Sequence, residues 1–315
     1  MTSATTFAEV EEVDQPWLWP GYVPEGLLTV LIAPPGASKT TLVSEIAARV
    51  SRGDAWPDGA GGISAAPVIM AALEDASESS MIHKLKAAHA DLANVVDASG
   101  GPDGDGLELT LDHMAWLHEV AAEHPGVALI VVDTLSASAT RPITTHAGLK
   151  AMLKPLNSLA KATGAAVILT AHTRKDGQPA GGQALISIPR HLLQIERSKE
   201  TPGERTLSVL KSNVTADDGE GIRYTLAGGG PATTVEWAWD AVRHGPGPDA
   251  TGQARILLLL RNSPGSISAQ LISAKTGIKY TVVRVLLSRM KRRGEVVPGE
   301  ARGSWTVPEA REHVA

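Results

Sequence analysis

The chain has 315 residues, of which 43% are hydrophobic and 20% charged, so we expect one large and one small packed domain and no extensive disorder. It contains no cysteine, which excludes disulfides and Cys-ligated zinc or iron–sulfur centres and fits a reducing compartment. Residues 251–315 hold 11 Lys and Arg against 4 Asp and Glu, a balance of +7, whereas residues 1–250 carry a balance of −12. This asymmetry points either to an anionic partner of the C-terminal segment or to the solvated surface of a small helical module.

The N-terminal segment gives an expectation about the compartment. Residues 1–17, MTSATTFAEVEEVDQPW, lack the basic and apolar pattern of a secretion signal, and no apolar run is as long as a membrane span. We therefore expect a soluble, cytoplasmic protein with no membrane partner.

The first predicted elements alternate between strand and helix. The apolar run PEGLLTVLI, residues 24–32, is bounded by turn residues and predicts a buried strand. Apolar residues at helical spacing predict a helix over 39–52, which Gly53 would end. A second strand is predicted over 67–72, and a helix follows it.

The same alternation continues through the middle of the chain. We predict a helix over 112–123, an apolar strand over 127–133, a helix over 146–163 and a strand over 165–172. Strands that are apolar throughout suit a parallel sheet covered on both faces, so the pattern predicts an α/β fold with a mostly parallel central sheet. Later strands, some of them antiparallel, are predicted over 191–197, 205–211 and 222–227.

A linker divides the predicted domains. RHGPGPDATG, residues 243–252, is rich in Pro and Gly, so we predict one domain over 1–242 and a second over 253–315. In the second domain, helical periodicity continues to Gly294 and a strand–turn–strand pattern follows. This order resembles that of winged-helix domains.

The first strand and the first helix are joined by a loop that nearly matches the phosphate-binding pattern G-x-x-x-x-G-K-[ST]. Its eight positions, Ala33 to Thr40, read APPGASKT. Backbone N–H groups at the helix start would bind phosphates, Lys39 would reach the β- and γ-phosphates, and the Thr40 hydroxyl would ligate Mg²⁺. The pattern thus predicts ATP and Mg²⁺ as cofactors and these nucleotide-binding residues: Pro35, Gly36, Ala37, Ser38, Lys39, Thr40 and Thr41.

Two positions of the loop depart from the pattern, since Ala33 and Ser38 stand where glycine is usual. Glycine is favoured where φ is positive or where the backbone must approach a ligand closely, and a non-glycine residue in the left-handed conformation costs about 1–2 kcal/mol. The alternative to a phosphate loop is a Pro/Gly turn followed by a helix that begins with lysine.

Three polar residues stand at the ends of predicted strands. Asp133 could hold Mg²⁺ through water, Glu74 could orient and deprotonate the attacking water, and His172 could sense the γ-phosphate. Each also has a simpler interpretation: an Asp that caps a turn, an acid that complements a helix dipole, or an ordinary polar strand end. Their order favours the catalytic interpretation, because α/β sheets bind ligands at the carboxyl ends of their strands.

This ordered set resembles the RecA-type ATPases, specifically the RepA-like hexameric replicative helicases of plasmids and phages, over about residues 17–226. The resemblance rests on WLWPGYVPEGLLTVLIAPPGASKTTL, VIMAALED, ALIVVDTLSA, VILTAHTRKDG, SIPRHLLQIER and LSVLKSN. It implies a RecA-like core that hydrolyses ATP at the subunit interfaces of a homo-oligomeric ring, a hexamer. It also implies that the ring moves on single-stranded DNA held in its channel.

The resemblance assigns roles residue by residue. Glu74 matches the catalytic glutamate, Asp133 the Walker B aspartate and His172 the sensor histidine. Arg190 matches the arginine finger that reaches the neighbouring subunit's nucleotide. Lys211 and Asn213 match a K-x-N element near the subunit interface. Where family members often carry Arg-Gly-Ser before the finger, this chain has AGG at 180–182.

The DNA contacts are implied in the same way. In related rings, the loops after the Walker B and sensor strands line the channel, which makes Arg141, Arg174 and Lys175 the candidate contacts to single-stranded DNA. The alternative is that these cations are merely solvated. In the C-terminal domain the candidate contacts to duplex DNA are Lys279, Tyr280, Arg284, Lys291 and Arg302. Such domains also bind proteins or stabilise assemblies.

Three functions follow from these patterns. The leading one is an ATP-driven DNA motor, a replicative helicase of a mobile element. The second is an ATP-gated DNA-binding regulator or recombination factor that does not unwind DNA. The third is a structural relic of an ATPase that no longer hydrolyses nucleotide.

Overall fold

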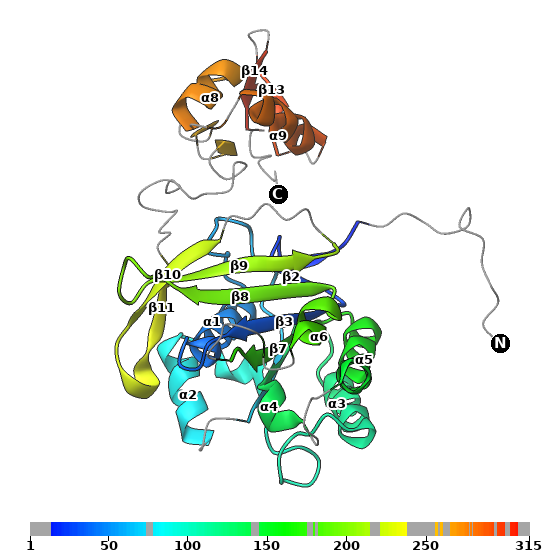
Figure 1. Ribbon diagram of the computed structural model, residues 1–315. Coiled ribbons are helices and arrows are strands. Elements are labelled where there is room, and N and C mark those ends of the chain that lie inside the picture. The colour runs from blue at the N-terminus through cyan, green and yellow to red at the C-terminus, as the bar shows by residue number, and fades with distance from the viewer. Residues whose placement is uncertain are drawn as a thin grey trace, which may run out of the picture. The chain divides into compact units, whose positions relative to one another are not determined.

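The central sheet is built from the apolar runs of the sequence. In the computed structural model, nine strands pair in the order β11-β10-β9-β8-β3-β7-β6-β4-β5 (Figure 1). Parallel pairing joins β3 (Leu28–Ala33), β4 (Val68–Ala72), β5 (Val95–Asp97), β6 (Leu129–Asp133), β7 (Ala166–His172) and β8 (His191–Arg197). β9 (Arg205–Ser212) is antiparallel to β8, and β10 (Ile222–Ala227) and β11 (Thr234–Trp237) complete the sheet. The predicted mostly parallel α/β sheet with antiparallel members is confirmed.

The structure describes residues 14–73, 78–139, 145–174, 179, 182–214 and 221–237, and in the C-terminal part 256–257, 259–260, 265–276, 278, 280–292, 295–299 and 303–307. The predicted linker, 243–252, lies outside these residues, so the predicted domain boundaries stay predictions. The chain divides into two compact units. One comprises Met1–Trp56, Ala60–Gly219 and Leu226–Val235, and the other Pro57–Gly59, Glu220–Thr225 and Glu236–Ala315.

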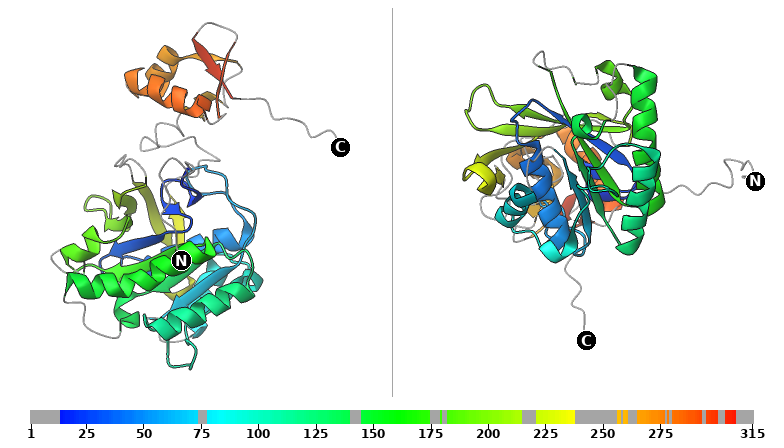
Figure 2. Two further views of the ribbon diagram at one scale, coloured as in Figure 1. Left: turned by 90° about the vertical axis from the view of Figure 1, so that its right-hand side faces the viewer. Right: turned by 90° about the horizontal axis from the view of Figure 1, so that it is seen from below.

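Helices cover both faces of the sheet, which explains why every residue of β3, β4 and β6 is buried. The helices α1 (Lys39–Arg52) and α2 (Glu78–Ala87) lie on one face, and α3 (Leu111–Glu123) and α5 (His146–Thr163) on the other (Figure 2). The short elements α4 (Leu135–Ser138), η2 (Leu92–Asn94) and α6 (Gln183–Ser187) connect the larger ones. Among the described residues, no helix combines the length and the hydrophobicity needed to cross a bilayer.

Glycine ends the first helix as predicted. Gly53 caps α1 in the left-handed conformation, with φ of 75°, and its N–H donates to the carbonyls of Arg49 and Val50. A Cβ at this position would lie 2.6 Å from the backbone nitrogen of Ala65, so the turn requires glycine for both conformation and space.

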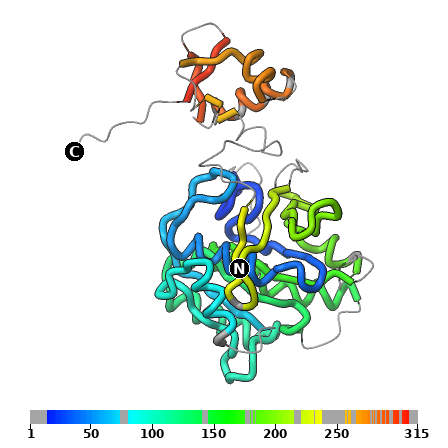
Figure 3. Tube along the Cα trace, turned by 90° about the vertical axis from the view of Figure 1, so that its left-hand side faces the viewer, coloured from blue at the N-terminus to red at the C-terminus, as the bar shows by residue number. Residues whose placement is uncertain are grey.

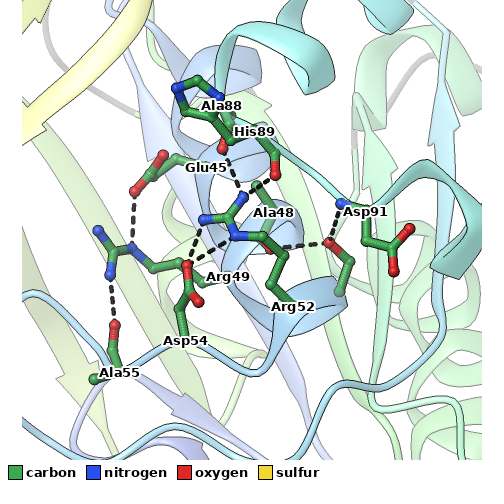
Figure 4. Close-up of polar contacts among 10 residues, drawn as sticks. Glu45, Ala48, Arg49, Arg52, Asp54, Ala55, Ala88, His89 and Asp91 are labelled. Carbon is green, nitrogen blue, oxygen red and sulfur yellow. Dashed lines mark hydrogen bonds and ion pairs between the residues drawn. The ribbon is translucent and has the colours of Figure 1, made fainter.

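Arg52 fixes the carboxyl end of α1 (Figure 4). Arg52 donates to the carbonyls of Ala88, at 2.9 Å, and His89, and its Nε lies 2.9 Å from Oδ2 of Asp54. Because Ala88 and His89 directly follow α2, Arg52 ties the end of one helix to the end of the next. This contact holds α1, whose first turn carries Lys39, against the rest of the unit.

The segments that flank the sheet pack through aromatic rings and turns. The strands β1 (Trp17–Trp19) and β2 (Val23–Pro24) pair with each other, and the ring of Trp19 stacks on Trp56 with centroids 4.8 Å apart. The turn η3 (Gly230–Ala232), between β10 and β11, lies against α2, where the yellow and cyan traces meet (Figure 3). The sequence patterns did not predict β1, β2, β5 or β11.

The smaller unit has its own core. It contains β12 (Ile267–Ser268), α8 (Ala269–Thr276), α9 (Tyr280–Arg292), β13 (Val297–Pro298) and β14 (Ser304–Thr306). The three strands form an antiparallel sheet in the order β12-β14-β13. Ile272, Val283, Leu287 and Met290 are buried between the helices and this sheet. The predicted helices and terminal hairpin are present, while the assignment of this unit to the winged-helix class stays a prediction.

Candidate active site

The predicted phosphate loop joins the carboxyl end of β3 to the first turn of α1. Within the loop the N–H of Ala37 donates to the carbonyl of Pro34 at 3.1 Å. At the start of the helix the N–H of Leu42 donates to the carbonyl of Ser38 at 2.9 Å. Lys39 and Thr40 are the first two residues of the helix. Since the first N–H groups of a helix have no partner within it, this geometry presents donors to an anion.

Only one of the two departures from the loop pattern affects the backbone. Ser38 has φ of 72° and ψ of 29°, the left-handed conformation that glycine adopts at least cost. Ala33 is instead the last residue of β3, where it is buried and lies opposite His172 in the sheet. The two substitutions are therefore not equivalent, and the strain falls on Ser38 alone.

This difference predicts opposite effects of two glycine substitutions. Ser38→Gly should relieve about 1–2 kcal/mol of backbone strain in the folded state. It should also cost about 0.4–1 kcal/mol of stability, because glycine gives the unfolded chain more conformational entropy. We therefore expect a net gain in the free energy of unfolding of about 0–1.6 kcal/mol and a change in ATP affinity below about 2 kcal/mol. Ala33→Gly, the matched control, should lower the free energy of unfolding by about 0.5–1 kcal/mol because a strand residue gains freedom. Urea unfolding and nucleotide titration measure both, and a destabilised Ser38→Gly protein would contradict the strain argument.

The lysine of the loop contacts the predicted sensor. Lys39 is only 5% exposed, and its Nζ lies 2.8 Å from Nδ1 of His172 at the end of β7. Because an ammonium group can only donate, Nδ1 of His172 accepts in this contact. The two side chains thus meet at the edge of the sheet beside the loop, where one phosphate group could contact both.

A threonine and a buried aspartate form the second half of the site. The Thr40 hydroxyl donates to Oδ2 of Asp133 at 2.6 Å, and the Thr170 hydroxyl donates to Oδ1 of the same carboxylate. Asp133 is 1% exposed, so these two donors fix a carboxylate that water hardly reaches. Mg²⁺ is commonly bound by one or two protein oxygens together with substrate phosphates, and Thr40 and Asp133 fit that role.

Two residues of this edge were not predicted. Thr170 is the polar residue of an apolar strand and lies two positions before His172, so both point to the same face. Arg197 ends β8, and its Nη2 donates to the carbonyl of Pro35 in the phosphate loop at 3.1 Å. No local signal marks Arg197, because only the parallel pairing of β8 with β3 brings the end of β8 to the loop.

Arg190 lies at the amino ends of the parallel strands, opposite the ends where the phosphate loop lies. It is exposed and directly precedes β8, whose first residue pairs with Thr29 near the start of β3. At the rise of a β-strand, this places its backbone about 16 Å from the end of β3, where the loop begins. The side chain of Arg190 therefore does not reach the phosphate loop of its own chain.

The predicted K-x-N element holds the segment that carries Arg190. The Nζ of Lys211 donates to the carbonyls of Ser187 and Pro189 at 2.7 and 2.8 Å, and the N–H of Asn213 donates to the carbonyl of Arg190 at 2.8 Å. Lys211 thus forms bonds within its own chain, and its predicted role across an interface stays a prediction.

The remaining predicted residues are distributed over both units. Arg174 is exposed just after β7, whereas Glu74, Arg141 and Lys175 lie outside the described residues. In the smaller unit, Tyr280, Arg284 and Lys291 are exposed on α9 and fall within about 40° of one another around the helix. Lys279 and Arg302 also lie outside the described residues.

A mostly parallel α/β sheet that brings a lysine of a phosphate loop and a threonine–aspartate pair together at the carboxyl ends of its strands defines a P-loop ATPase domain. The sequence model of a protein family described as an AAA domain matches residues 3–178, which is more than half of the chain. The chain therefore belongs to the AAA domain family. No curated protein matches the sequence closely enough to serve as a relative.

Proposed function

We propose that the protein is an ATP-driven DNA motor of the RepA-like helicase kind, which works as a homo-oligomeric ring, a hexamer. The observation that carries this proposal is the separation of Arg190 from its own phosphate loop. An exposed arginine about 16 Å from the loop of its own chain can act on nucleotide only across a subunit interface. Such a finger makes hydrolysis depend on the ring.

Within each site the residues divide the chemistry. Lys39 binds the β- and γ-phosphates, and His172, which it contacts at 2.8 Å, detects whether the γ-phosphate is present. Thr40 and Asp133 would hold Mg²⁺, which neutralises charge on the phosphates when bound. Glu74 is proposed to orient and deprotonate the attacking water, as its place in the sequence predicts.

Charge supports DNA as the substrate of the motor. Arg174 is exposed two residues after His172, the last residue of β7, so a ligand in the ring channel could be sensed through β7. In the smaller unit, a winged helix by this proposal, the exposed Tyr280, Arg284 and Lys291 share one face of α9, and the last 65 residues carry a balance of +7. We propose that single-stranded DNA occupies the channel and that this unit contacts duplex DNA.

The face of α9 also supports the second candidate function. A helix that exposes an aromatic and two basic side chains on one face is typical of a helix that enters the major groove. A protein that bound duplex DNA in this way and used ATP only to control assembly would be a regulator and not a helicase.

Steady-state ATPase rates with and without single-stranded DNA test the proposal. We expect single-stranded DNA to raise the rate of the unmodified protein and Lys39→Ala to have no turnover under either condition. Lys161→Ala, which removes an exposed lysine of α5, is the matched control and should behave as the unmodified protein. Absence of Lys39-dependent turnover even with DNA would rule out the motor. DNA-stimulated turnover without strand displacement would instead favour the regulator.

A further inference from the structure

We infer that Arg197 belongs to the nucleotide site and binds the α-phosphate and ribose end of the nucleotide, away from the γ-phosphate. This inference rests on the proposed function, since it requires that the loop binds a nucleotide. The resemblance to RepA-like helicases assigns Arg197 no role.

The register of the sheet brings Arg197 to the loop. Gln194 of β8 lies opposite Ile32 of β3, so Arg197, three residues further, is level with the loop itself. Its Nη2 donates to the carbonyl of Pro35 at 3.1 Å, and a Cβ on Gly36 would lie 3.1 Å from the same atom. The guanidinium group is therefore held against the backbone that would bind phosphate.

The order of the strands tells which end of the nucleotide Arg197 would meet. β7 and β6, which carry His172 and Asp133, lie on one side of β3, and β8 lies on the other. The groups that bind Mg²⁺ and the terminal phosphate are thus on the β7 side of the loop. A nucleotide bound there extends away from its γ-phosphate, which brings its α-phosphate and ribose toward β8 and Arg197.

The charges around Arg197 are those of an anion site. Arg197 lies directly opposite Arg205 on β9, and like charges in this arrangement destabilise a sheet. Among the described residues, neither arginine has a carboxylate within ion-pair distance; each donates to a carbonyl, Arg197 to Pro35 and Arg205 to Gly203 at 2.6 Å. The Nε of Arg205 is buried and has no partner among these residues. A bound phosphate would offset the repulsion and give the two guanidinium groups the anionic partner that neither has among these residues.

Nucleotide affinity tests the contact. Arg197→Met should weaken binding of ATP and of ADP by a similar factor of about ten or more, the usual effect of losing a hydrogen bond to a charged group. Arg197→Lys should recover part of the loss, because it keeps the charge but not the planar fork. Lys199→Met removes an exposed charge two residues further on and should leave both affinities unchanged. Titration of fluorescent ATP and ADP analogues with the full-length chain gives these values.

Three outcomes would overturn the inference. Unchanged affinities for Arg197→Met would remove the contact, and a loss confined to ATP would place it at the γ-phosphate. If Lys39→Ala bound both nucleotides as tightly as the unmodified protein, the proposed function would itself be wrong and the inference would fall with it. If Lys39→Ala weakens nucleotide binding but Arg197→Met does not, only the arginine contact is rejected. The failure of the inference can therefore be distinguished from the failure of the proposed function.

Discussion

Replacement of Asp133 by asparagine should lower the kcat/KM of ATP hydrolysis by about 10³ or more, which corresponds to at least about 4 kcal/mol. Asp133 is buried, and its two oxygens accept from the hydroxyls of Thr40 and Thr170. Asparagine keeps the size of the side chain but removes the negative charge that would hold Mg²⁺ beside the phosphates. Initial rates measured over a series of Mg²⁺ concentrations test this, and nucleotide binding without Mg²⁺ should change little.

Thr170→Val is the matched variant, because valine fills nearly the same space in a fully buried position and removes only the hydroxyl. Loss of a group that orients a metal ligand usually costs about 10–100-fold in metal affinity. We therefore expect this variant to need more Mg²⁺ but to recover its rate when Mg²⁺ is high, which Asp133→Asn should not do. Equal and irreversible loss in both variants would show that Thr170 does more than orient Asp133.

The long elements of the fold could be predicted because local signals define them. The helices α1 and α5 have the predicted bounds, since each ends at a glycine in the left-handed conformation, Gly53 and Gly164. The strands β3, β4, β6 and β7 follow from apolar runs that only a sheet covered on both faces can bury. The short strands β5 and β11 carry no such run, and they form because a neighbouring strand is there to pair with them.

The position of a site residue could be predicted where the residue ends an apolar strand. It could not be predicted where it depends on which strands pair and in what register. Asp133 and His172 lie at the ends of β6 and β7, and the apolar runs before them were enough to predict that position, although their catalytic roles stay predictions. Arg197 was missed because only the pairing of β8 with β3 shows that it reaches the loop. The unequal roles of Ala33 and Ser38 depend on φ, which a sequence pattern does not contain.

Arg190→Ala should lower the ATPase rate of the assembled protein by about 10³–10⁵, the usual contribution of an arginine finger. Its nucleotide affinity should change little, because Arg190 does not reach the phosphate loop of its own chain. Lys211→Met should have a smaller effect in the same direction. It removes the two bonds to Ser187 and Pro189 that hold the segment before Arg190, but leaves the guanidinium group in place. Rates at saturating ATP, with affinities measured separately, distinguish these effects from a loss of binding.

Mixing the inactive Arg190→Ala and Lys39→Ala proteins separates action across the interface from action within one chain. In a ring of both variants, some interfaces join an intact Lys39 site to an intact Arg190 of the neighbour. With random assembly of equal amounts, these are about a quarter of all interfaces. A finger that acts across the interface therefore restores activity up to about that fraction, whereas one that acts within its own chain restores none, because no chain in the mixture carries both residues. Mixed rings that form but stay inactive would thus remove the strongest support for a motor that depends on its ring.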